Sequence, residues 1–265
     1  YYIWGGGVLI FKFLLRDPLL FFIKYDRLYT LSFRDALFFL TGGAQRKPCA
    51  SRRKGKGEMK GNRLPNKFFK ENPLLDNSAA MLMYWSVDGE FWSILCRELF
   101  DTLEDPERKK KIEETHDRIA RTEDPAELVE IMRKGYDNFN QQQLCEKVLE
   151  KQEETMPLVL KRFRTCSLDL FIEAAAVVLA RGDRKYAIQL REMYQDIRCP
   201  YARACACLIF GIQGMDGEIP FLVEEYERFC EEGFEQSISE DDEDDTSRDY
   251  EEFPLLALYI LHGKW

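Results

Sequence analysis

The sequence predicts an all-α protein, built as a right-handed solenoid of stacked antiparallel helix pairs. Proline occurs at or near expected first helical positions, where its missing N–H costs nothing: it follows Asn72, Asp105, Asp124 and Cys199. Glycine falls where helices should end, at residues 135, 182, 214 and 233. Alternating β-branched runs bounded by Asn-Gly or Asp-Gly turns are missing from the sequence. These observations favour consecutive helices with short joints.

A repeat links the segments 171–197 and 203–229. When Gly182 is set on Gly214, a spacing of 32, small and aliphatic residues align before each glycine. The aligned positions that follow also match: Leu190 with Leu222, Tyr194 with Tyr226, and Ile197 with Phe229. A period of this length in paired amphipathic helices predicts a solenoid, because each pair must bury its apolar face against the next pair.

Over about residues 140–263 the pattern resembles HEAT-like repeats. Besides the period, the resemblance rests on a proline near the start of a second helix, at Pro157 and Pro220. It implies short apolar first helices and longer charged second helices that line a concave surface. Residues 72–135 are expected to form helix pairs of poorer regularity. A non-repetitive helical bundle remains the alternative.

The expected helices each begin or end at one of these signals or follow an apolar stripe. They cover residues 78–87, 90–103, 106–121, 125–134, 139–152, 156–165, 168–181, 184–197, 200–212, 217–232 and 250–262. The segment 106–121 has a thin apolar stripe of Ile112, Thr115 and Ile119 among charges, which predicts a solvated helix with one narrow packing edge.

Residues 1–58 differ from the rest of the chain. The chain starts without Met, and its first Met is Met59. Arg, Lys, Gly and Glu can all be encoded by purines alone, so "RRKGKGE" before Met59 has the composition of a translated ribosome-binding site. We therefore interpret 1–58 as untranslated upstream sequence in a bacterial reading frame, or as a disordered segment, and 59–265 as the helical-repeat domain. Because the last expected helix lacks a partner, we expect that the natural protein continues or that this helix packs unusually.

Charge is concentrated in two segments of this chain, whose net charge is −9. Residues 45–70 carry ten basic residues and one acid, so nucleic-acid binding by this basic segment is an alternative function. Residues 235–252 carry ten acids and one base, and 235–249 should form an acidic loop. Charges and Pro18 interrupt the apolar N-terminal stretch, so no membrane span is expected.

Signals for catalysis, metal binding and cofactors are weak. The eight cysteines are expected to be buried thiols in a reducing cytoplasm. In the CxC of Cys205 and Cys207 the two sulfurs should point to different faces of a helix, and neither of the two histidines is near in sequence. We therefore expect no metal, no cofactor and no catalytic residues. An enzyme on a helical-repeat scaffold is a further alternative, by analogy alone.

The favoured function is that of a cytoplasmic scaffold or adaptor that binds a protein or peptide. Its expected contacts are charged side chains of the second helices and of the acidic loop. These candidate residues are Lys161, Arg164, Arg184, Arg191, Arg228, Asp241, Asp242, Asp244 and Asp245. Their mixed charge suits protein better than nucleic acid, which requires a basic stripe.

Overall fold

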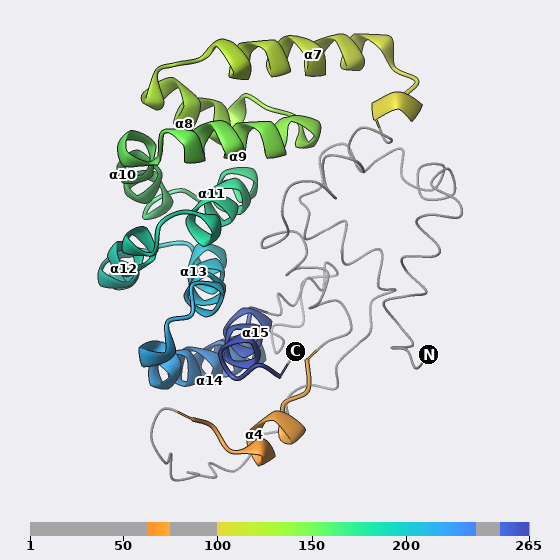
Figure 1. The fold of residues 1–265 in the computed structure, drawn as a ribbon. Coiled ribbons are helices and arrows are strands. Elements are labelled where there is room, and N and C mark those ends of the chain that lie inside the picture. The colour runs from red at the N-terminus through yellow and green to blue at the C-terminus, as the bar shows by residue number, and fades with distance from the viewer. Residues whose placement is uncertain (1–62, 75–99, 237–249, 265) are drawn as a thin grey trace, which may run out of the picture.

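The computed structural model describes residues 63–74, 100–236 and 250–264, and the elements it contains there are helices (Figure 1). This confirms the all-α prediction for these residues. The α-helices are α4 (Asn66–Glu71), α7 (Pro106–Arg121), α8 (Pro125–Lys134), α9 (Gln141–Glu150), α10 (Gln152–Phe163), α11 (Asp169–Arg181), α12 (Arg184–Glu192), α13 (Pro200–Ile212), α14 (Ile219–Gln236) and α15 (Glu252–Leu261). Short 3-10 turns are η2 (Asn138–Asn140), η3 (Tyr194–Asp196) and η4 (Asp216–Glu218). The expected helix 78–87 and most of 90–103 lie outside the described residues.

The helix starts that follow an X-Pro pair agree with the prediction. α7, α8 and α13 each begin at a proline, and their ends match the expected ranges 106–121, 125–134 and 200–212. The Asp105 side chain accepts hydrogen bonds from two backbone N–H groups of the first turn of α7, at 2.9 and 3.1 Å. Asp124 caps α8 in the same way. The aspartate cap accepts hydrogen bonds from free N–H groups of the first turn, and the proline has no N–H that needs an acceptor.

The helix expected over 156–165 starts four residues earlier than predicted. α9 ends at Glu150 and α10 starts at Gln152, so Pro157 lies inside α10. The Thr155 hydroxyl donates to the Val148 carbonyl at 2.8 Å, which satisfies one of the last carbonyls of α9. Pro157 is close enough to the helix start to remove a single backbone hydrogen bond there.

The single helix expected over 184–197 is also shorter. α12 ends at Glu192, and the turn η3 completes the segment. The remaining helices, α11, α14 and α15, differ from their expected ranges only at the ends. Helix ends are the positions where local signals are weakest.

The helices follow one another in chain order, from α7 at one end to α14 and α15 at the other (Figure 1). α9, α11, α13 and α15 form one row in which each helix contacts the next. α8 and α10, and then α10 and α12, are in contact in a second row. Consecutive helices also pack across the rows, as α10 does on α11 and α12 on α13.

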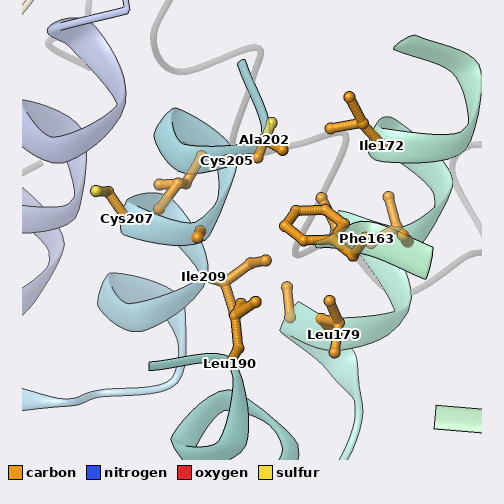
Figure 2. Packing of buried hydrophobic residues seen from close by; sticks show 14 of the residues in the cluster. Phe163, Ile172, Leu179, Leu190, Ala202, Cys205, Cys207 and Ile209 are labelled. Carbon is orange, nitrogen blue, oxygen red and sulfur yellow. The ribbon is translucent and has the colours of Figure 1, made fainter. Parts of the chain in front are cut away.

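The apolar core lies between the two rows, and α11 of the first row is buried over most of its length. Every residue of α11 from Phe171 to Ala180 is buried, including Glu173. Figure 2 shows Phe163 of α10 facing Ile172 and Leu179 of α11, with Ile209 of α13 nearby. Burial of this continuous apolar surface is the main stabilising term of the fold.

Four of the six described cysteines agree with the expectation of buried core thiols, whereas Cys199 and Cys230 are only partly buried. Cys145, Cys166, Cys205 and Cys207 are buried and belong to no disulfide. Cys205 lies near Glu173 and Tyr201, whereas Cys207 lies near Tyr194 and Glu225, so the two sulfurs of the CxC point to different faces of α13. Burial raises the pKa of the Cys145 and Cys207 thiols to about 12, which keeps both protonated and poorly nucleophilic.

Positions that the 32-residue register aligns have similar environments. Leu190 and Leu222 are both fully buried, and Tyr194 and Tyr226 are both buried. Gln213, at the end of α13, donates from its side-chain amide to three carbonyls near the end of α11, at 2.8 to 3.3 Å. This amide joins one helix pair to the next.

The last helix is covered by a segment from far earlier in the chain. α4 packs on α15, where the Tyr259 hydroxyl donates to the carbonyls of Phe69 and Asn72, both at 2.9 Å. The Leu64 N–H donates to His262 Nε2 at 2.9 Å, and Phe69 is buried. α4 is thus a partner of α15 that the sequence did not predict (Figure 1).

Candidate functional site

The five basic candidate residues lie on the second helices α10, α12 and α14 or at their ends. Four of them contact other described residues. Arg164 pairs with Asp196 at 3.8 Å, Arg184 donates to the Gly214 carbonyl at 3.2 Å, Arg191 pairs with Glu218 at 2.5 Å, and Arg228 pairs with Glu225 and with Glu232. Lys161 is exposed and forms no ion pair with another described residue.

Several of these contacts connect successive helix pairs. Arg164 at the end of α10 contacts η3, and Arg184 at the start of α12 contacts the loop after α13. Arg191 of α12 pairs with η4, and its guanidinium lies 3.8 Å from the ring centre of Phe221. Arg164, Arg184 and Arg191 therefore link consecutive parts of the helical stack. Asp241, Asp242, Asp244 and Asp245 lie outside the described residues.

A similar contact links the loop between α7 and α8 to α9. Glu123 pairs with Lys151 and, at 3.0 Å, with Lys147. Hydrogen bonds from Lys151 and Lys147 lower the pKa of Glu123 from 4.5 to about 2. Because the folded-state pKa is depressed, the stabilisation is present above pH 4.5 and is lost as the pH falls toward 2.

We expect an NMR titration of the Glu123 carboxyl in the folded protein to give a pKa near 2 at low salt. Lys147→Met with Lys151→Met should return it toward 4.5, because both hydrogen-bonding cations are removed. Added salt should also raise the Glu123 pKa toward 4.5, since the Glu123 side chain is 67% exposed and its ion pairs are screened. A Glu123 pKa that is the same in the wild type and the double variant would contradict this assignment.

A groove lies between α7 and the joint that follows α8. Its cavity volume is about 510 Å³. α7 contributes one helical face, and the C-terminal end of α8 with the residues after it forms the opposite wall. The lining residues are Arg108, Lys111, Ile112, Glu114, Thr115, Arg118, Lys134, Gly135, Tyr136 and Asp137.

The wall of this groove, which we call the α7–α8 groove, is fixed by internal contacts. Arg108 donates through two nitrogens to Asp137, at 3.0 and 3.2 Å. The Tyr136 hydroxyl donates to the Leu170 carbonyl at 2.9 Å and thereby ties the joint to α11. Burial raises the pKa of Tyr136 well above its usual range, so the phenol remains a neutral donor.

A second groove on the other side of Arg118 has the opposite balance of charge. It measures about 500 Å³ and is lined by Glu114, Asp117, Arg118, Arg121, Thr122, Glu123 and Glu127. Acids outnumber bases in this lining, whereas bases outnumber acids in the α7–α8 groove. The two sides of α7 therefore present different electrostatic environments.

Sequence reasoning missed the α7–α8 groove. It predicted α7 correctly as a solvated helix with a narrow packing edge, and Ile112 and Ile119 are indeed buried. The available signal was that Arg108, Lys111 and Thr115 recur at helical spacing on the same face as Ile112. Nothing in the sequence showed that Lys134 would lie opposite them.

Within residues 63–74, 100–236 and 250–264, no three His, Cys, Asp or Glu side chains gather to hold a metal ion. None of the helices described there is long and apolar enough to cross a membrane.

Searches of protein-family models, curated proteins and solved structures found no match to this chain.

Proposed function

We propose that this chain is a HEAT-like helical-repeat scaffold, a right-handed solenoid that binds a protein or peptide partner in the cytoplasm. The observation that carries the proposal is the agreement between the 32-residue register and the packing. Leu190 with Leu222, and Ile197 with Phe229, are aligned by sequence and equally buried in successive helix pairs. In such an array each pair contacts mainly its neighbours, and the extended outer surface is left for binding.

The exposed side chains of the scaffold support a partner of mixed or acidic character. Lys161 stays a proposed contact because its charge is not used internally. Asp241, Asp242, Asp244 and Asp245 stay proposed contacts for basic groups of a partner. The internally paired arginines are proposed to shape the surface more than to bind.

Selection from a peptide library on the purified full chain tests this function. We expect related sequences to be enriched, and the enriched peptides to bind the folded protein in solution at one site per chain. The matched control is selection on the same protein unfolded in urea. Failure to enrich any sequence beyond that control would refute the scaffold proposal, as would binding of the enriched peptides to the unfolded chain alone.

A further inference from the structure

We infer that the α7–α8 groove binds an acidic peptide segment of the partner, with an apolar side chain of that segment placed against Tyr136. This inference rests on the proposed function, since it names the chemistry of the partner and the place where it docks. The groove is bounded by described residues on both walls, and its volume of about 510 Å³ is comparable to the size of pockets that hold small ligands or a few side chains.

The charge balance around the groove argues for an acidic occupant. Asp137 is matched by Arg108, and Glu127 is matched by Arg118. Glu130 of α8 lies outside the lining and pairs with three cations: Arg133 at 2.7 Å, Lys134 at 3.1 Å and Arg162 at 3.7 Å. Of these three cations Lys134 lines the groove, and it shares this one carboxylate with two arginines.

Lys111 adds positive charge from the other wall. It lines the groove from α7, is exposed, and forms no ion pair with any described residue. Glu114 is the remaining acid of the lining, and it pairs with Lys110 at 3.7 Å. Lys111 therefore faces the groove from one wall without an internal acid, and Lys134 faces it from the other wall while sharing Glu130 with two arginines. Carboxylates of a bound segment would meet both.

The same lining favours a peptide over a nucleic acid. A polyphosphate needs a continuous basic stripe, and here Glu114 and Asp137 interrupt the cations. The half-buried Tyr136 supplies apolar surface, and Thr115 supplies a hydroxyl that can donate to or accept from a peptide group. Carboxylates spaced along a chain with an apolar residue between them match this pattern.

The test uses the full chain and a fluorescein-labelled oligoglutamate peptide with a central leucine, followed by fluorescence anisotropy. Lys111→Glu with Lys134→Glu should weaken binding at least about tenfold, since it replaces attraction by repulsion at both walls. Lys111→Gln with Lys134→Gln should give a smaller loss and avoids new repulsion with Glu130 and Glu114. Lys70→Glu is the control, because Lys70 is an exposed lysine on α4, at the other end of the stack (Figure 1). Thermal unfolding checks that each variant is folded.

Binding that falls in both groove variants, persists in the Lys70 variant and weakens with salt supports the inference. Wild-type affinity in the groove variants overturns it, as does absence of wild-type binding to the peptide. A single-stranded oligonucleotide that binds in place of the peptide, and is displaced by the same substitutions, also overturns it. Library peptides that bind the groove variants as well as they bind wild type would leave the scaffold proposal standing and place the docking site elsewhere.

Discussion

Gly211→Leu is expected to destabilise the protein by about 2–4 kcal/mol, because it forces apart the two helices with the most extensive contact. Gly211 lies in α13 against Ala257 of α15. A Cβ added at Gly211 would lie 2.6 Å from Ala257 Cα and 2.7 Å from Ala257 Cβ. The first of these atoms is backbone, so no change of side-chain rotamer relieves the clash.

The smaller change Gly211→Ala separates this packing effect from helix propensity. Alanine is favoured over glycine inside a helix by about 1 kcal/mol, so propensity alone predicts a more stable protein. The clash with Ala257 predicts the opposite sign, and we expect the clash to dominate. Urea unfolding measures the free energy of unfolding for each variant.

Two matched variants make the test specific to the α13–α15 contact. Gly217→Ala should be close to neutral, because a Cβ there meets nothing within 4 Å. Ala257→Gly should restore part of the stability of Gly211→Ala, since it removes the facing Cβ, and a double-mutant cycle would measure the coupling. Equal effects of alanine at Gly211 and at Gly217 would show that the close approach does not limit stability.

The parts of this fold that sequence predicted are those with local chemical signals. Asp105-Pro106 contains both a cap and a first-turn proline, and α7 begins where that pair predicts. The fully apolar segment within α11 predicts burial on all sides, and Phe171 to Ala180 are buried. In these elements the local preference and the tertiary environment agree.

The parts that sequence missed depend on contacts between distant segments. The break between α9 and α10 falls at Lys151, earlier than the expected start at residue 156, and the Thr155 hydroxyl there supplies a partner for α9. α4 has six residues and no apolar period, so its stability comes from the contact of Phe69 with Tyr259 and His262. The charge of the α7–α8 groove likewise depends on which acid pairs with each cation in the folded chain, and sequence does not show these pairs.

A buried polar cluster formed by η3, α13 and α14 supplies the second large effect. The Tyr194 hydroxyl donates to the Glu225 carboxylate, which also accepts from Arg228. Tyr194 and Glu225 are both buried, and the Cys207 sulfur lies 3.6 Å from the hydroxyl. Burial raises the pKa of Tyr194 well above its usual range, so its hydroxyl is a permanent donor to Glu225. Glu225 is thus the acceptor that satisfies two groups at once.

Glu225→Ala is therefore expected to destabilise the protein by about 2–3 kcal/mol, since it leaves the buried Tyr194 hydroxyl without its acceptor and removes one of the two carboxylates that pair with Arg228. Tyr194→Phe should cost less, about 1–2 kcal/mol, because the Glu225–Arg228 pair survives. Glu224→Ala is the control: Glu224 is adjacent in sequence and exposed, so its loss is expected to change the free energy of unfolding little.

Urea unfolding of the three variants and of Tyr194→Phe with Glu225→Ala measures the coupling. The losses of Tyr194→Phe and Glu225→Ala should be less than additive, because both single changes remove the same hydrogen bond. Strictly additive losses would mean that Tyr194 and Glu225 stabilise α14 independently, and that Arg228 is the only group that depends on the carboxylate.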